Sequence, residues 1–283
     1  MLPRSEIIAW RAQADWSRDS QIEQDLLITR AMLAIFSDPF LSEHVAMRGG
    51  TVLHKIHLAP ASRYSEDIDL VLFTDRDIGH IRKALARVLQ PVLGPPALDV
   101  LGTIRLAVRN AVLPSSVAQM KFVYSPTTPP PARMTVKVEV NFSERDPFYR
   151  IVDLPYHPPL AEVHTPVRIR SYDLDEMLGT KMRALLQRTQ GRDLYDLDLA
   201  LARPAADGTL PDPDRVMAAF REYMRRENTH VTRAFFEREL AKKLVTPGFR
   251  VDTAAMLPVG YTFDVDAAAK RVQAELLSRL PTG

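Results

Sequence analysis

The sequence predicts an α/β (α+β) fold in which a mixed β-sheet domain is followed by a helical domain. Two observations lead to this prediction. Strand-like apolar runs fall between residues 45 and 170, where helical periodicity and turn residues separate them. From residue 173 onward, helical patterns follow one another and no strand pattern returns. We therefore place the sheet domain at residues 1–170 and the helical domain at residues 171–283, with the boundary near Ser171.

The composition is that of an ordinary globular protein, and it excludes several kinds of site. Of the 283 residues, 46% are hydrophobic and 25% are charged, so the chain can bury a substantial core. The absence of cysteine excludes disulfides, thiolate zinc sites and a cysteine nucleophile. A net charge of +2 gives no overall attraction to nucleic acid, so any RNA contact has to be local.

Hydropathy predicts a cytoplasmic protein with no membrane partner. No apolar run approaches the roughly 20 residues that span a bilayer. The first ten residues, MLPRSEIIAW, lack the apolar core of a signal peptide.

The N-terminal segment predicts two helices that pack on the first strand. They cover residues 5–17 and 21–36, and Asp19 or Ser20 is the expected N-cap of the second helix. A short apolar strand at residues 45–47 follows.

A paired-glycine turn then leads directly into a helix. Gly49 and Gly50 break the strand, and apolar residues from Thr51 onward recur at helical spacing. The first N–H groups of a helix have no partner within it, so such a junction can bind phosphate through its backbone. The alternative is a plain turn with no ligand.

The next strand, at residues 66–73, carries two carboxylates on one face. Strand side chains alternate, so Asp67 and Asp69 project to one side while Ile68 and Leu70 project to the other. Neighbouring like charges repel, and paired carboxylates are therefore usually joined by a cation. Oxygen ligands favour Mg²⁺ or Mn²⁺. The alternative is a solvated strand end without a metal.

The order of strand, Gly-Gly turn, helix and Asp-x-Asp strand resembles the DNA polymerase β-like nucleotidyltransferase superfamily. Within it, the sequence is similar to the AbiEii family of bacterial toxins, which includes the MenT toxins. Many superfamily members carry Gly-Ser at the turn, whereas this chain has Gly49, Gly50 and Thr51, which argues against antibiotic adenylyltransferases and polymerases. The matching residues are Gly49, Gly50, Thr51, Leu53, Arg63, Ser65, Glu66, Asp67, Ile68, Asp69 and Leu70.

The rest of the sheet domain alternates between predicted elements and proline-rich segments. A helix at residues 77–89 is expected to be ended by Pro91, Gly94 and Pro95-Pro96, and three strands are expected at residues 100–108, 117–124 and 134–142. Residues 126–131 contain four prolines and predict a loop. A second proline-rich segment, residues 147–166, predicts a surface connector, and residues 167–170 predict a last edge strand.

Glu139 is the candidate for a third carboxylate. In the strand at residues 134–142, Lys137, Glu139 and Asn141 share the polar face. The superfamily resemblance implies a third acidic metal ligand on such a strand. The alternative is an ordinary ion pair of Glu139 on an open sheet face.

The helical domain begins with an amphipathic helix at residues 173–188 that carries a lysine in its apolar stripe. Lys181 lies three residues after Leu178 and four before Leu185, so it either extends to solvent or meets an anion. Gly191 is expected to cap this helix at its C-terminus. The next helix would then place Asp193 and Asp196 on one face.

This segment resembles a second block of the AbiEii family. The resemblance implies that the block faces the Asp-x-Asp strand across a cleft, which the helical domain closes. It also implies that Lys181 contacts nucleotide phosphates and that Asp193 is required for activity, either as the base or to orient the acceptor. The matching residues are Lys181, Ala184, Leu185, Arg188, Arg192, Asp193, Asp196 and Leu197.

Further helices are expected at residues 215–226, 231–244 and 264–280, with breaks at residues 247–248 and 258–260. Basic residues gather in the first two of these helices, but glutamates are interleaved with them. Both a solvated charged face and an RNA-binding face fit this pattern.

Together, the two blocks imply a Mg²⁺-dependent nucleotidyltransferase toxin of a toxin–antitoxin system. Asp67 and Asp69 would hold Mg²⁺ or Mn²⁺ with Glu139 as a third ligand, and Gly49, Gly50, Thr51, Arg63, Ser65 and Lys181 would bind the nucleotide. The resemblance implies an NTP donor, the 3′ end of a tRNA as acceptor and a separate cognate antitoxin. Two other functions stay open: a nucleotidyltransferase that modifies a protein hydroxyl, and a catalytically silent NTP-binding module. The presence of Asp67, Asp69, Lys181 and Asp193 speaks against the second.

Overall fold

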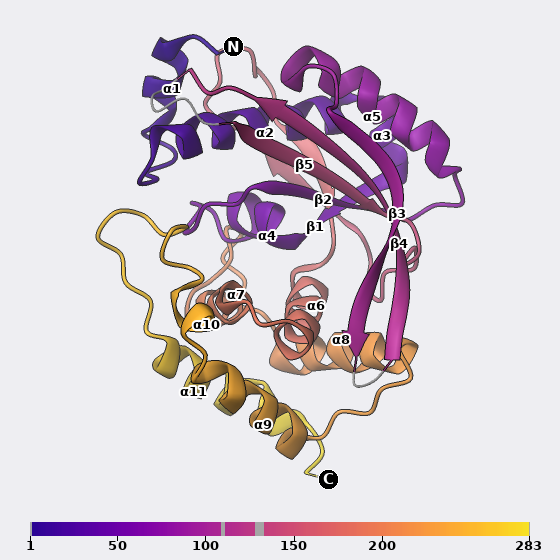
Figure 1. The fold of residues 1–283 in the computed structure, drawn as a ribbon, viewed down its shortest axis with the longest axis vertical. Coiled ribbons are helices and arrows are strands. Elements are labelled where there is room, and N and C mark those ends of the chain that lie inside the picture. The colour runs from indigo at the N-terminus through magenta and orange to yellow at the C-terminus, as the bar shows by residue number, and fades with distance from the viewer. Residues whose placement is uncertain (1, 109–110, 128–132, 283) are drawn as a thin grey trace.

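A computed structural model describes residues 2–108, 111–127 and 133–282. Its centre is a mixed seven-stranded sheet with the strand order β3-β4-β5-β2-β1-β7-β6. The prediction of a mixed sheet followed by helices is confirmed (Figure 1). The strands are β1 (Val45–Arg48), β2 (Asp67–Leu72), β3 (Leu98–Val108), β4 (Ala111–Tyr124), β5 (Met134–Asn141), β6 (Val152–Tyr156) and β7 (Val167–Ser171).

Helices cover one face of the sheet and form the second half of the chain. α2 contacts β2, β5 and β7 and packs against α5. In Figure 1, α6 to α11 form a separate layer below the sheet, and the long β3–β4 hairpin reaches down toward α8. The helices are α1 (Arg4–Trp10), α2 (Asp19–Ser37), α3 (Pro39–His44), α4 (Gly49–Val52), the π-helical turn η1 (Leu53–His57), α5 (Ile78–Leu93), α6 (Leu174–Gln187), α7 (Gly191–Ala202), α8 (Pro213–Arg226), α9 (Arg233–Leu244), α10 (Pro247–Val251), α11 (Val265–Glu275) and the 3₁₀ turn η2 (Leu277–Arg279). No helix in the described ranges is both long and apolar enough to cross a membrane.

The register of the central strands places the acidic residues side by side. β2 runs antiparallel to β1 and parallel to β5, with Asp67 opposite Lys137 and Asp69 opposite Glu139. Because paired residues share a face, these four side chains lie on the same side of the sheet. The alternate residues, such as Ile68 and Val138, are buried on the opposite side.

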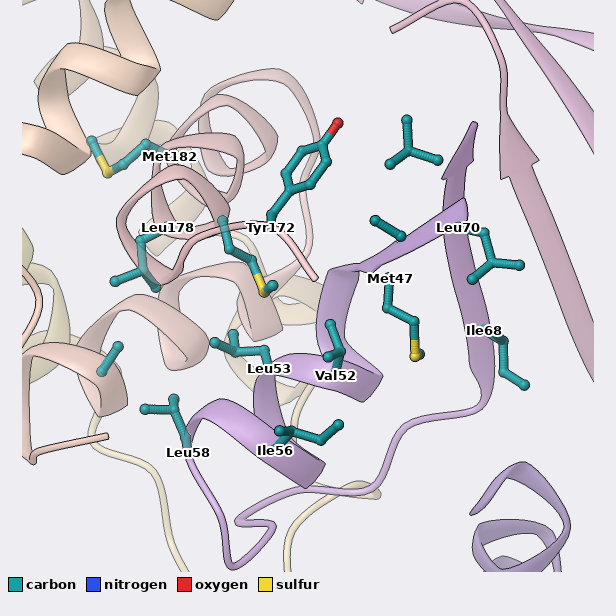
Figure 2. Packing of buried hydrophobic residues seen from close by; sticks show 14 of the residues in the cluster. Met47, Val52, Leu53, Ile56, Leu58, Ile68, Leu70, Tyr172, Leu178 and Met182 are labelled. Atoms are coloured by element: carbon teal, nitrogen blue, oxygen red, sulfur yellow. The ribbon is translucent and has the colours of Figure 1, made fainter. Parts of the chain in front are cut away.

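One hydrophobic cluster runs through both halves of the chain. It contains residues of every helix from α6 to α9 as well as residues of the sheet and α2. Figure 2 shows how Val52 and Leu53, just after the glycine turn, lie between Met47 of β1 and the residues Leu178 and Met182 of α6. The glycine turn is therefore fixed by core packing on both sides.

Two predictions about the end of the sheet were wrong. The connector at residues 147–166 contains a strand, β6, which pairs antiparallel with β7. β6 is the edge strand and β7 lies inside the sheet, between β6 and β1. Pro155, which made the segment look like a loop, is tolerated because an edge strand leaves one side unpaired. Of the proline-rich segment at residues 126–131, residues 128–131 lie outside the described residues.

Several helix limits also differ from the predictions. α5 continues past Pro91 to Leu93, and Gly94, one of its predicted breaks, is the C-cap with a φ of +79°. Gly191 begins α7 rather than capping α6. The position requires glycine because a Cβ there would lie 2.1 Å from the carbonyl oxygen of Phe249. The predicted break at residues 247–248 is the first turn of α10, and proline suits that position. α1 ends at Trp10, and Arg18 caps α2 in place of Asp19 or Ser20.

Candidate active site

A cavity of about 610 Å³ lies where the polar face of the sheet meets α6 and the start of α7. The two sequence blocks, which are about 110 residues apart in the chain, form its opposite walls. The predicted site residues that line it are Gly49, Gly50, Arg63, Ser65, Asp67, Asp69, Glu139, Lys181 and Arg192. Thr51, Asp193 and Asp196 are fully buried and do not line it.

Both positions of the turn require glycine, because the side chains of other residues lie directly against them. Gly49 has a φ of +82°, and a Cβ there would lie 2.2 Å from Asp69 Oδ2. A Cβ on Gly50 would lie 2.4 Å from Arg63 Nη2. The absence of side chains therefore brings the N-terminus of α4 against a carboxylate on one side and a guanidinium on the other.

Thr51 fixes the turn to the acidic strand. Its buried hydroxyl donates to the carbonyl oxygen of Asp67 and lies 2.8 Å from Ser65 Oγ. Ser65 in turn lines the cavity. Thr51 thus supports the strand that carries Asp67, rather than facing a ligand itself.

The carboxylates of β2 and β5 have different partners. Lys137 Nζ lies 3.0 Å from Asp67 Oδ2 and 3.5 Å from Glu139 Oε2. Glu139 also accepts a hydrogen bond from the side-chain amide of Gln119 on β4. Within the described part of the chain, the Asp69 carboxylate has neither an ion pair nor a hydrogen bond, although Gly49 packs against it.

The clustering of charges changes the acidity of these groups. Burial raises the pKa of Asp67; Lys137 opposes this effect while Asp69 adds to it, and the resulting pKa is about 6. Burial lowers the pKa of Lys137, but the charges of Asp67 and Glu139 outweigh it and the pKa lies above its ordinary value. The lysine is therefore a firmly charged ammonium.

No three acidic or histidine side chains in the described residues form a ready metal-binding group. Two of the three carboxylates on this face, those of Asp67 and Glu139, instead contact the Lys137 ammonium. The alternation along the strand already predicted that Lys137 and Glu139 share a face, so the position of Lys137 could be predicted from the sequence. Gln119 gave no such signal, because it lies on a strand with no acidic motif.

On the opposite wall, Asp196 is the centre of a buried network. Arg63 donates to it through two nitrogens, at 2.6 and 2.8 Å. Lys181 Nζ lies 2.7 Å from Asp196 Oδ2, and His54 Nε2 lies 2.8 Å from Oδ1. Burial raises the pKa of Asp196, but Arg63 and Lys181 hold it well below its ordinary value.

Asp193 is held in a similar way. Arg188 donates to both its oxygens at 2.7 Å, and Lys181 Nζ lies 3.3 Å from Oδ1. Burial raises the pKa of Asp193, but Lys181 and Arg188 lower it below the ordinary value. Lys181, Arg63 and Arg188 all line the cavity and together carry more charge than the two carboxylates behind them. This wall is positive and faces the acidic sheet.

Lys181 therefore meets anions, as the second of the two alternatives for its buried position predicted. The ammonium does not extend to solvent, since only 7% of the side chain is exposed. The anions in the structure are the chain's own aspartates. Contact with a nucleotide phosphate stays a prediction.

A further set of charges closes one end of the cavity. Glu144 accepts from Arg48 at 2.5 Å and from Arg183 at 2.6 Å, and Arg183 also pairs with Glu227 at 3.1 Å. These residues come from β1, the loop after β5, α6 and the end of α8. No sequence motif singled them out, because the partners are far apart in the chain.

The basic residues of α8 and α9 are largely paired with neighbouring glutamates. Glu222 binds Arg225 and Arg226, and Glu237 binds Arg233. This is the arrangement of a solvated charged face.

Comparison with known proteins relates the chain to nucleotidyltransferase toxins. One protein family matches residues 30–271, and its description reads "Nucleotidyl transferase AbiEii toxin, Type IV TA system". Among solved structures, the fold is similar to that of MenT4, a nucleotidyltransferase toxin from Mycobacterium tuberculosis H37Rv, with a TM-score of 0.58 and 15% sequence identity over 99% of this chain and 91% of that chain. At this level of identity, the likeness concerns the fold. No curated protein sequence matches the chain.

Proposed function

The chain belongs to the AbiEii family of nucleotidyltransferase toxins of type IV toxin–antitoxin systems, and we propose that it transfers a nucleotide from an NTP to an RNA acceptor in a Mg²⁺-dependent reaction. One observation carries the proposal. An acidic wall with Asp67 and Asp69 faces a positive wall with Lys181 and Arg188 across a cavity large enough for a nucleotide. This charge arrangement suits a metal-bound triphosphate.

Asp67 and Asp69 are the residues that would hold Mg²⁺ or Mn²⁺. The structural features that fit a metal are the unpartnered Asp69 carboxylate and the adjacent Gly49, where a Cβ would collide with that carboxylate. Mg²⁺ is commonly bound by only one or two carboxylates, the other ligands being phosphate oxygens and water. Glu139 is the third carboxylate of this wall, and Gln119 orients it. When bound, the metal would neutralise the triphosphate and help to activate the attacking hydroxyl.

The chain itself would bind and orient the phosphates. Gly49 and Gly50 line the cavity at the start of α4, where backbone N–H groups would bind phosphate. Arg63, which packs against Gly50, and Lys181 and Arg188 of the second block add positive charge to the cavity, and Ser65 and Arg192 also line it. Asp196 holds Arg63 and Lys181 in position through its buried ion pairs.

We assign Asp193 to positioning rather than to proton transfer. It is fully buried and does not line the cavity. Lys181 and Arg188 lower its pKa, which makes it a poor base. It would act by holding the side chains of Lys181 and Arg188 in place to contact the phosphates, so we still expect it to be essential for activity.

The acceptor that the family resemblance favours is the 3′ end of a tRNA, and the partner that controls the toxin would be a separate antitoxin. The test is incubation of the protein with each labelled NTP, Mg²⁺ and either total tRNA or a bacterial lysate. We expect label in ribonuclease-sensitive material. Label that only protease removes would favour the protein-hydroxyl alternative, and no transfer with any NTP would favour the silent binding module.

Asp69→Ala is the variant that tests the acidic wall. Transfer should fall by at least about two orders of magnitude, because a carboxylate at the developing charge is lost. The melting temperature should stay the same or rise, since Asp69 has no partner to lose and repels its neighbours. Expression without antitoxin should stop bacterial growth for the wild type and not for Asp69→Ala. Near-normal transfer by this variant in saturating Mg²⁺ would contradict the assignment.

A further inference from the structure

Lys137 bridges two strands of the acidic wall. Its ammonium contacts Asp67 of β2 at 3.0 Å and Glu139 of its own strand at 3.5 Å. Within the described residues, no other cation forms an ion pair with either carboxylate. Lys137 is thus the resident positive charge of the site where the family function requires a metal.

The charge balance explains why a resident cation is needed. Asp67, Asp69 and Glu139 lie on neighbouring positions of one sheet face, and like charges at this separation repel. A single ammonium leaves two negative charges in excess, which matches the charge of one divalent cation. The ammonium therefore offsets part of this repulsion in the absence of a metal without neutralising the acidic wall.

The lysine is also free to leave. Its side chain is 27% exposed and lines the cavity, so no packed residue closes over it. A lysine is a compact charge on a flexible stem, and moving it breaks no fixed planar geometry. The anions nearest to a displaced ammonium would be the phosphates of a nucleotide in the same cavity.

We propose that Lys137 is an exchangeable counter-ion: it holds Asp67 and Glu139 while no metal is present, and it moves to the triphosphate when metal and nucleotide enter together. The inference rests on the proposed function, since it requires a metal-bound NTP in this cavity. Its consequence is that free metal competes with the ammonium and binds weakly alone. Metal and nucleotide then favour each other's binding.

The experiment measures two affinities in the full-length protein. The first is for Mn²⁺ alone, by calorimetry and by electron paramagnetic resonance. The second is for a non-hydrolysable NTP analogue in saturating Mg²⁺. Lys137→Met should bind Mn²⁺ about tenfold more tightly, because one competing charge is removed, and should bind the analogue about tenfold more weakly, because one charge-assisted contact is lost. Lys137→Arg should lie between wild type and the Met variant in both measurements.

Lys121→Met is the matched control. Lys121 lies directly opposite Lys137 on β4, and the substitution makes the same change of charge and size on the neighbouring strand. Since Lys121 does not line the cavity and forms no ion pair with Asp67 or Glu139, both affinities should change much less than in Lys137→Met. Thermal melting gives an independent reading: Mn²⁺ should raise the melting temperature of Lys137→Met more than that of the wild type. Lys137→Gln, which keeps a hydrogen-bond donor for Asp67, gives the same comparisons if the Met variant does not fold.

The outcomes separate this inference from the function on which it rests. Tighter Mn²⁺ binding together with weaker analogue binding supports the exchange. Unchanged or weaker Mn²⁺ binding by both Lys137→Met and Lys137→Gln overturns it, while analogue binding by the wild type would leave the proposed function intact. A wild-type protein that binds neither Mn²⁺ nor the analogue would overturn both.

Discussion

At the scale of single residues, buried ion pairs decide where the cations of the cavity lie. Lys181 shares Asp193 with Arg188 and shares Asp196 with Arg63. Asp193 therefore keeps Arg188, and Asp196 keeps Arg63 and His54, if the lysine is removed. Removal of the lysine therefore leaves neither aspartate without a cation, although the lysine also lines the cavity.

Lys181→Met should accordingly lower stability moderately and nucleotide affinity strongly. Loss of a buried ion pair commonly costs about 3–5 kcal/mol. Because Arg188 and Arg63 remain, we expect only about 1–3 kcal/mol here. Affinity for a non-hydrolysable NTP should fall by about one to two orders of magnitude, and Lys181→Arg should restore it only in part. Urea unfolding and calorimetry measure the two quantities.

Lys55→Met controls for the loss of a buried lysine. Lys55 is as buried as Lys181, with 7% of each side chain exposed, and it pairs with Asp25 at 2.6 Å. It does not line the cavity, so its removal should lower stability and leave nucleotide affinity unchanged. Equal nucleotide affinity in Lys181→Met and the wild type would show that Lys181 has a structural role alone.

At the scale of elements, the unit from β1 through the glycine turn to β2 could be predicted from the sequence because its signals are local. The strand, the turn, the helix start and the alternating aspartates all lie within about 30 consecutive residues. Lys181 was also detectable, since a charge in an apolar stripe is a local conflict. The contacts between such residues could not be predicted from the sequence. Arg63 and Asp196, for example, are 133 residues apart and meet only in the folded chain.

β6 is a strand that local sequence signals did not predict. Its proline and the prolines around it resemble a loop, and the pairing with β7 makes it a strand. Gly191 was assigned to a helix end because glycine is common there, whereas its neighbour Phe249 is the reason for glycine. In both cases a contact distant in sequence decided the structure.

Gly50→Ala tests the close packing of the turn. The new Cβ would lie 2.4 Å from Arg63 Nη2, so the guanidinium has to shift away from Asp196. The buried aspartate would lose part of its pairing, and we expect the free energy of unfolding to fall by about 2–4 kcal/mol. Gly248→Ala is the control, because a Cβ there would meet no atom within 4 Å. Similar unfolding free energies for the two variants would contradict the importance of this approach.

At the scale of the whole molecule, the two predicted domains share their interior. The hydrophobic cluster crosses the boundary near Ser171, and Glu144 joins Arg48 of β1 to Arg183 of α6 beside the cavity. The boundary stays a prediction about folding units, since no observation here separates them. A pattern of strands followed by helices predicts the order of the elements, but it does not reveal how much core they share.

The shared interior contains two neutral histidines, and one of them should make stability depend on pH. Burial lowers the pKa of His57 to about 4, against the opposing effect of the Asp173 and Asp207 charges. The unfolded chain takes up this proton near pH 6.5, so between about pH 6.5 and 4 it binds more protons than the folded chain. Stability is therefore complete above this range and falls as the pH decreases through it, by about 1.4 kcal/mol per pH unit for this one group.

His54 and Asp67 also titrate in this range, so the contribution of His57 has to be measured as a difference. His57→Gln keeps a group able to hydrogen-bond the Ser171 hydroxyl, which lies 3.0 Å from His57 Nε2, but it cannot take up the proton. Urea unfolding of both proteins at several pH values should give a flatter curve for the variant between pH 4 and 6.5. Above pH 7 the two curves should run parallel, because neither the histidine nor its replacement changes charge there. Curves that stay parallel down to pH 4 would mean that His57 becomes protonated in the folded chain as readily as in the unfolded one, and that its burial imposes no penalty on the charge.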